Sequence, residues 1–115
     1  NGLDKKKFNK TIKNLQYSNS VIDFYVNENL KKNTYFNQKK NRLILNRVFF
    51  IQPYEVVFRA FSDSLRLVGK KYYSVRGKKL ERIIKNIENE RLFKATLGNC
   101  IIEKVNQTVI ISKEH

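Results

Sequence analysis

The sequence contains no Trp or Met, one Cys, one His and one Pro, and it has no apolar run of membrane-spanning length. A single Cys cannot form an internal disulfide, and one Cys with one His cannot supply the four ligands of a structural zinc site. A signal-peptide pattern is also absent. We therefore expect a reducing, cytoplasmic location, with no membrane-spanning segment.

Groups able to perform catalysis are scarce. His115 is the last residue, where packing cannot hold a general base in place. Cys100 has no His beside it to activate the thiol, so a small buried hydrophobic residue is expected there. The ten acidic residues are scattered and the four glycines are isolated, which indicates neither an acid–base pair nor a phosphate-binding loop. We expect no catalytic residue, metal or cofactor in this chain.

Acidic residues are also few relative to basic ones. The 24 Lys and Arg residues against ten Asp and Glu give a formal charge of +14. Such an excess attracts polyanions, with nucleic acid the first candidate and an anionic membrane the second. Because the chain also holds fourteen Asn, a Lys-rich coding bias is an alternative source of part of this charge.

Enough apolar residues are present for one folded core. The 115 residues are 41% hydrophobic and 12% aromatic, which is typical of globular sequences and of one modest domain. Periodic apolar residues predict three helices, at residues 3–30, at 53–69 after the only proline, and at 76–89.

Strands are expected in two regions. Residues 42–52 are rich in Leu, Ile, Val and Phe, and are interrupted at Asn46, which favours two short strands or one bulged strand. Residues 93–114 predict a strand, a tight turn at Asn106–Gln107 and a return strand, with a longer loop as the alternative because the turn is not the preferred Asn-Gly type. Residues 33–41 show neither helical nor strand periodicity, so we expect a loop there.

The expected fold is therefore α+β, with a long N-terminal helix, two further helices and a small, mainly antiparallel sheet. We divide the chain into a helical segment with its loop, residues 1–41, and an α+β region, residues 42–115, and expect the two to form one unit.

The cations are concentrated in two stretches. Residues 31–47 hold six bases and no acid, and residues 66–82 hold seven bases and one acid, while the remainder to the C-terminus is nearly balanced. Contacts of this kind with phosphates release counterions and supply much of the affinity for nucleic acid. The predicted RNA contacts are Arg66, Lys70, Lys71, Arg76, Lys78, Lys79 and Arg82, with Lys39, Lys40 and Arg42 as a second area.

Two tyrosines and one arginine within or near these stretches have open roles. Tyr72 and Tyr73 are candidates to stack on unpaired bases, and the alternative is that they pack under the helices. The cations themselves have the alternative of an ordinary solvated surface. Arg59 is expected to pair with Glu55 or Asp63 in its own helix.

Read end to end, the chain resembles the C-terminal portion of tRNA(Ile)-lysidine synthase, especially its alphaproteobacterial members. The resemblance lies in GLDKKKFNKTIKNL near the start, PYEVVFRAFSDSLRLVGKKYYSVRGKKLERI in the middle, and ATLGNCII with the closing SKE. It covers most of the chain, and least well residues 33–46. This chain has Gly98–Asn99 where the family usually has Gly-Gly, and Lys113–Glu114 where the family has Arg-Glu.

The resemblance implies a parent enzyme of the PP-loop ATPase superfamily. In that family an N-terminal domain uses ATP and Mg to adenylate the wobble cytidine of a tRNA and then joins lysine to it. The family's Ser-Gly-Gly-x-Asp-Ser signature is absent here. The resemblance thus implies a tRNA-positioning portion whose partners are tRNA and the ATPase domain.

Other functions remain open at this point. The first is a protein-interaction module that docks the Val and Phe face of the 53–69 helix on a partner and uses its charge for solubility. Association with anionic lipid would require basic and apolar residues on one exposed helix, but the apolar stripes are expected to be in the core. Homodimerisation through the long helix is a further possibility.

Overall fold

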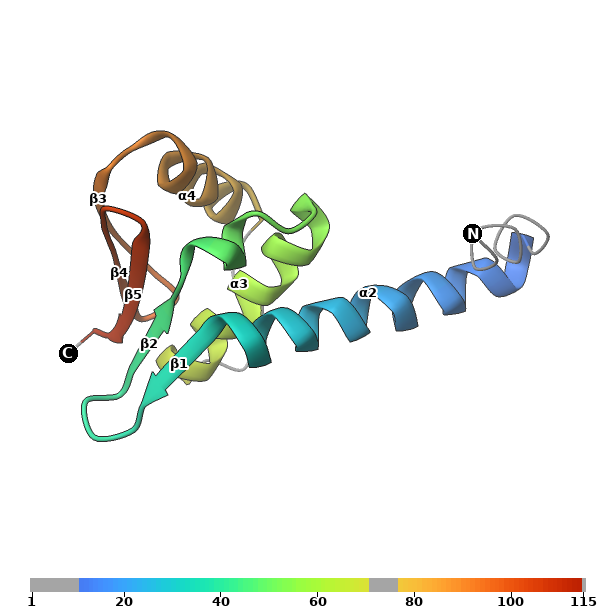
Figure 1. Ribbon diagram of the computed structural model, residues 1–115, viewed down its shortest axis with the longest axis horizontal. Helices are drawn as coiled ribbons and strands as arrows, with labels where there is room; N and C mark the ends of the chain where they lie inside the picture. The colour runs from blue at the N-terminus through green and yellow to red at the C-terminus, as the bar shows by residue number, and fades with distance from the viewer. Residues whose placement is uncertain (1–10, 71–76, 115) are drawn as a thin grey trace.

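A five-stranded antiparallel sheet with helices on one face forms the described part of the chain (Figure 1). The structure is a computed structural model that describes residues 11–70 and 77–114, with side chains from Ser20 onward. The strand order is β1-β2-β5-β4-β3, so β2 and β5 join an N-terminal hairpin to a C-terminal meander. The predicted α+β class is confirmed.

The first described element is the long helix α2 (Thr11–Asn33), whose N-terminal half reaches away from the rest of the fold (Figure 1). Prediction placed this helix at 3–30; it ends three residues later, and residues 1–10 lie outside the described part. Near its end Asn29 is buried and donates from Nδ2 to the Phe49 carbonyl oxygen at 3.2 Å. Asn33 donates in turn to Asn29 Oδ1 at 2.8 Å. These amides tie the last turns of α2 to the segment after β2.

The loop predicted for residues 33–41 is wrong at residues 34–37, which form strand β1 (Thr34–Asn37), and is confirmed at residues 38–41, which form a turn. β1 pairs in antiparallel register with β2 (Arg42–Leu45), and Asn41 in the intervening turn has a φ of 51°. Four residues of mixed polarity are too few to show a strand period. The predicted division between residues 41 and 42 falls within this hairpin, which places both segments in one sheet.

The prediction of two short strands or one bulged strand within residues 42–52 is confirmed only for the first four residues, which form β2. After β2 the chain forms a 3-10 helix, η1 (Arg47–Phe50). Asn46 caps it, since its Oδ1 accepts a hydrogen bond from the Phe49 amide at 3.1 Å. This local bond from side chain to backbone overrides the strand preference of the Val and Phe residues.

The helix α3 (Tyr54–Gly69) lies across the inner face of the sheet and confirms the prediction for residues 53–69. Pro53 is the N-cap, with the fixed φ of −52° that suits this position, and its carbonyl oxygen accepts from the Val57 amide at 3.0 Å. Glu55 occupies the first turn, where the helix dipole favours a negative charge. The buried apolar residues of α3 are Val56, Val57, Ala60, Phe61, Leu65 and Val68.

The end of α3 is fixed by a close approach to the sheet. Lys70 caps the helix with a φ of 60°, and its amide donates to the Arg66 carbonyl oxygen at 2.9 Å. Gly69 has no positive φ and is needed for space, because a Cβ there would lie 2.2 Å from the Gly98 carbonyl oxygen. Asn99 Nδ2 also donates to the Gly69 carbonyl oxygen at 3.1 Å.

After a segment outside the described residues, α4 (Gly77–Asn89) confirms the third predicted helix. The chain then forms β3 (Leu92–Leu97), β4 (Cys100–Val105) and β5 (Thr108–Lys113). The single strand predicted before Asn106 is wrong, because Gly98 and Asn99 both take positive φ values, of 60° and 67°, and form a two-residue hairpin turn. The tight turn at Asn106–Gln107 is confirmed, with a φ of 61° at Asn106.

One apolar core lies between the inner face of the sheet and the helices. Inward side chains align across strands, since Leu43 pairs with Ile111, and Ile111 with Ile102. α3 covers the centre of the sheet, α4 covers the β3 edge, and α2 packs on α3 and η1. Fully buried side chains include Phe49, Phe61, Leu45, Leu65, Leu80 and Ile84.

The close contact of α3 with the β3–β4 turn predicts a strong effect of Gly69→Ala. The added Cβ would meet backbone, which cannot rotate away, so we expect the free energy of unfolding to fall by about 2–3 kcal/mol. Urea denaturation measures the change.

Gly77→Ala is the matched control. A Cβ at Gly77 would lie 3.8 Å from the Phe58 ring, which is ordinary contact, and Ala favours helix. Stability should stay the same or rise by up to about 1 kcal/mol. Equal effects of the two substitutions would show that the Gly69 contact is not tight.

Candidate nucleic-acid interface

A ridge of exposed cations runs along α4. Leu80, Ile83, Ile84 and Ile87 bury one face of this helix. Lys78, Arg82 and Lys85 are exposed and follow one another at steps of four and three, which places them on the opposite face. We call these three residues the α4 ridge. Lys79 is also exposed, to one side of it.

The ion pairs of the described residues do not include the cations of α4. Within residues 20–70 and 77–114, ion pairs join Lys32 to Glu28, Arg59 to Glu55 and Asp23, and Arg66 to Asp63, and none includes a cation of α4. The acids Glu81 and Glu88 lie beside the ridge and face Tyr54, together with Lys85, around a hollow of about 400 Å³. Burial of the ring and the charge of Glu81 raise the pKa of Tyr54. The outward charge of α4 is therefore mainly positive along the ridge.

The predicted contact Arg66 differs from the ridge, because it pairs with Asp63 one turn earlier in α3. Arg59 pairs with Glu55 at 2.8 Å, which confirms its predicted internal role, and lies 3.9 Å from Asp23 of α2. Both arginines line a hollow of about 480 Å³ between α2, α3 and the start of α4. Their carboxylate partners reduce the charge that they offer to a polyanion.

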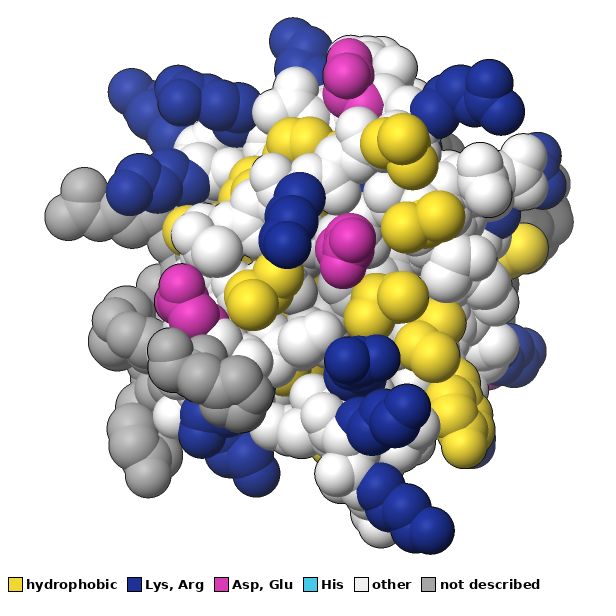
Figure 2. Space-filling view, turned by 90° about the vertical axis from the view of Figure 1, so that its left-hand side faces the viewer, with side chains coloured by type: hydrophobic (Ala, Val, Ile, Leu, Met, Phe, Trp, Pro, Cys, Tyr) yellow, Lys and Arg dark blue, Asp and Glu magenta, His cyan; other side chains and the backbone are white. Residues whose placement is uncertain are grey.

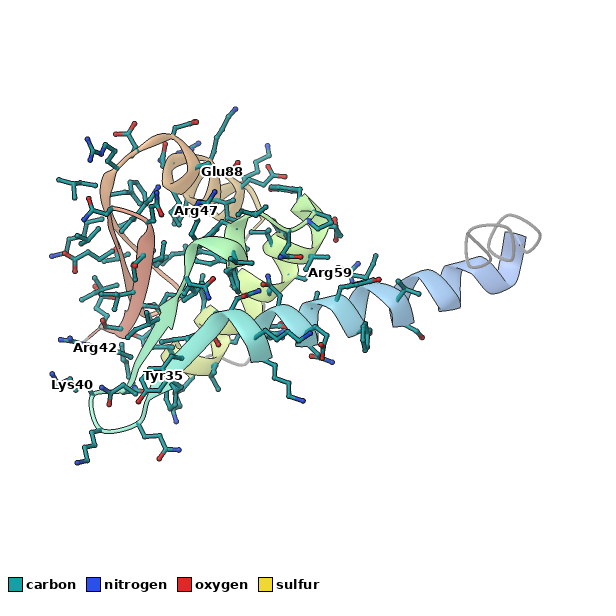
Figure 3. All side chains as sticks on the ribbon, in the orientation of Figure 1. Tyr35, Lys40, Arg42, Arg47, Arg59 and Glu88 are labelled. Carbon is teal, nitrogen blue, oxygen red and sulfur yellow. The ribbon has the colours of Figure 1, made fainter. Side chains whose placement is uncertain are left out.

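The second predicted area lies at the far end of the molecule. Lys39 and Lys40 are exposed in the β1–β2 turn, and Arg42 is exposed at the start of β2. Figure 3 places Lys40 and Arg42 at the hairpin tip, at the opposite end from Glu88 of α4. The structure thus brings Lys78, Lys79 and Arg82 together on α4 and separates them from the hairpin cations.

The remaining predicted residues follow α3 in the sequence. Lys70 is exposed next to the β3–β4 turn. Lys71, Tyr72, Tyr73 and Arg76 lie outside the described residues, as does His115.

An apolar surface that sequence reasoning missed lies on the outer face of the sheet. No helix of the described residues covers this face, and Tyr35, Leu92 and Val105 are 65%, 69% and 43% exposed there. Figure 2 views this side and shows apolar side chains in a broken band with Lys and Arg mainly around it. The sequence feature that could have predicted this surface is the presence of apolar and β-branched residues on both faces of the strands, as at Ile44 and Ile110.

The environment of Cys100 is that of a buried structural thiol. Cys100 is buried, and its thiol donates to the Leu65 carbonyl oxygen with an S···O distance of 3.3 Å. Burial raises its pKa to about 11, which keeps it in the unreactive thiol form. No three His, Cys, Asp or Glu side chains in the described part of the chain could hold a metal ion together. None of the helices described is long and apolar enough to cross a membrane.

Comparison with known proteins gives no family for the chain, since no family model, curated protein or solved structure matches it.

The raised pKa of Cys100 predicts a specific loss of stability at high pH. Between about pH 9 and 11 the folded state keeps the thiol proton that the unfolded state releases, so stability falls as pH rises through this interval. Urea midpoints of the parent should fall more between pH 8 and 10 than those of Cys100→Ala. Parallel pH dependences would contradict the assignment of a buried thiol.

Proposed function

We propose that this chain binds structured RNA through the α4 ridge. The observation that carries the proposal is the position of Lys78, Arg82 and Lys85, exposed on one face of a helix whose other face is buried. Carboxylates of the described residues form no ion pair with them. These charges are therefore available to phosphates, and their number and the net charge of +14 favour a polyanion as partner.

The dimensions of the ridge suit a phosphate backbone. Lys78 and Lys85 are separated by seven residues, which is about 10 Å along a helix axis. Duplex nucleic acid carries several phosphates over such a distance, so each cation can neutralise one of them. A rigid helix also holds the three side chains in a fixed order, which reduces the entropy lost on binding.

The more specific form of the proposal is a tRNA-positioning portion of tRNA(Ile)-lysidine synthase in the cytoplasm. It depends on the resemblance of the chain to that family, which rests on the order and spacing of the three matching segments together. In this proposal the ridge grips tRNA, with Lys70 and the hairpin cations Lys39, Lys40 and Arg42 as further contacts. ATP, Mg and the chemistry that ligates lysine to the wobble cytidine belong to a PP-loop ATPase domain, which is the second partner.

A second candidate function is a protein-interaction module, because one face of the sheet is uncovered and partly apolar. The Val and Phe face of α3, the docking surface considered in this alternative, is not accessible to a partner, since Val57 and Phe61 are buried in the core. The outer sheet face around Tyr35 and Leu92 would serve instead. Membrane association is less favoured, because the apolar stripes of α3 and α4 are also buried.

Charge reversal on the ridge tests RNA binding. Lys78→Glu and Arg82→Glu should each weaken binding to tRNA by about tenfold at low salt, because each removes a phosphate contact and adds a repulsive charge. Each should also reduce the slope of log affinity against log salt by about one. Filter binding across a salt series measures both quantities.

Lys31→Glu is the control, since Lys31 is an exposed lysine on α2 and the change in net charge is the same. It should weaken binding less than either ridge substitution. Equal losses of affinity in all three variants would show that net charge, and not the position of the ridge, determines binding. Binding of a protein partner with no salt dependence, and no binding of tRNA, would favour the second candidate function.

A further inference from the structure

Apolar side chains from all five strands form a band across the outer face of the sheet. Cross-strand neighbours on this face are Tyr35 and Ile44, Ile44 and Ile110, and Val105 and Leu92. Val105 and Ile110 are diagonal neighbours on β4 and β5, because the residue opposite Val105 is two positions before Ile110. We call these five residues the outer band.

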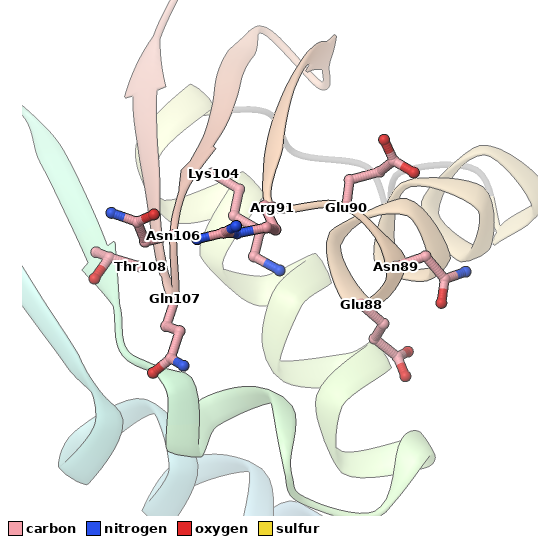
Figure 4. A pocket seen from close by; sticks show the side chains of 8 residues that line it. All are labelled: Glu88, Asn89, Glu90, Arg91, Lys104, Asn106, Gln107 and Thr108. Atoms are coloured by element: carbon pink, nitrogen blue, oxygen red, sulfur yellow. The ribbon is translucent and has the colours of Figure 1, made fainter.

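The side of the sheet on which the band lies can be followed at the β4–β5 turn (Figure 4). Lys104 faces α4, since its Nζ donates to the Ile87 carbonyl oxygen. Thr108 is directed away from α4, on the opposite side of the sheet. Val105 is the cross-strand partner of Thr108 and the neighbour of Lys104 in β4, so it shares that outer side. The helices of the described residues pack on the other face and leave the band uncovered.

The band departs from the pattern of a sheet with one face in water. Such a sheet has apolar residues inward and polar residues outward in alternation. In the band the outward residue is apolar as well, so that Ile44 and Ile110 each lie between two buried apolar neighbours. The adjoining outward positions are mostly polar, at Asn37, Arg42, Ser112 and Thr96. Exposed apolar residues gathered in one band indicate an interaction surface.

Cations lie at both ends of the outer band. Arg42 at the start of β2 and Lys40 in the adjoining turn are exposed, and Figure 3 places both on the side that Figure 2 views. Lys94 is exposed on β3, at the other end. Glu103 is the cross-strand partner of Lys94, and the ion pairs of residues 20–70 and 77–114 include neither. The band is therefore bordered by more positive than negative charge.

We propose that the outer band docks an acidic amphipathic helix of a protein partner. Five strands spaced about 4.8 Å apart make the band roughly 19 Å long, which matches about 13 residues of α-helix. Apolar side chains that recur at each turn of such a helix would lie along the band. Asp or Glu on the flanks of the helix would meet Arg42, Lys40 and Lys94. The inference goes beyond RNA binding by the α4 ridge and does not depend on it.

The same features disfavour other occupants of the band. Single-stranded RNA binds through bases that stack on aromatic rings, and Tyr35 is the one aromatic residue of the five. A second copy of this chain would bring a net charge of +14 against the same cations. An acidic partner combines attraction to these cations with burial of the apolar side chains.

The probe for the test is a labelled helical peptide of about 15 residues, with Leu at positions i, i+4, i+7 and i+11 and Glu beside them. Fluorescence anisotropy should show about tenfold tighter binding than for a peptide of the same composition whose Leu residues are scrambled around the helix. A peptide with Lys in place of Glu should also bind more weakly. Leu92→Gln should weaken binding of the probe by about tenfold, because a buried Leu contact is lost.

Leu67→Gln is the matched control, since Leu67 is 54% exposed on α3, at the opposite side of the sheet. It should keep the affinity of the parent for the probe. Arg42→Glu should weaken binding more than Lys31→Glu, although the two change the net charge equally. Urea midpoints check that each variant is folded, and filter binding should show that Leu92→Gln keeps the affinity of the parent for tRNA.

Four results would overturn the inference. The first two are equal binding of the probe and the scrambled peptide, and equal losses in Leu92→Gln and Leu67→Gln. The third is a dimer of the parent in sedimentation that Leu92→Gln abolishes, which would assign the band to a second copy. The fourth is a loss of tRNA binding in Leu92→Gln, which would assign it to RNA. Absence of tRNA binding by the parent would instead remove the proposed function and leave this inference intact.

Discussion

The structure depends on the contact between the end of α3 and the β3–β4 turn, where Gly69 leaves no room for a Cβ against the Gly98 carbonyl oxygen. The Asn99 amide and the Cys100 thiol add hydrogen bonds to α3 at the same place. This contact fixes the direction of α3 across the sheet. Because α3 occupies the centre of the inner face, α4 covers the β3 edge, and the side of α4 opposite the core faces solvent.

That arrangement decides which charges are available to a partner. The apolar stripe of α4 is buried, so its cations lie on the outer side of the helix. There they stay hydrated and avoid the free-energy cost of burying a charge. Arg66 instead lines a hollow that also contains Asp23 and Asp63, and it pairs with Asp63. Two cations that are similar in the sequence thus have different roles, because burial and neighbouring acids differ. The α4 ridge is therefore the candidate surface for a polyanion.

The sequence predicts α3 and α4 well, because both have apolar residues at helical spacing over three turns or more and clear ends at Pro53 and near Gly69. Prediction from the sequence fails for β1, because four residues are too few to show the alternation of a strand. It also fails for η1, because the Asn46 cap outweighs the strand preference of the Val and Phe residues. The density of cations on α4 can also be predicted. The separation of these cations from the hairpin cations could not be predicted, since it depends on how the sheet and helices pack.

Mapping of amide chemical shifts by NMR during titration with tRNA tests the central claim most directly, because it reports which surface the RNA contacts without any substitution. Our account predicts the largest changes along α4, at Lys78, Arg82 and Lys85, and small changes on the outer sheet face at Tyr35 and Leu92. The largest changes on the sheet face, with α4 unaffected, would contradict it.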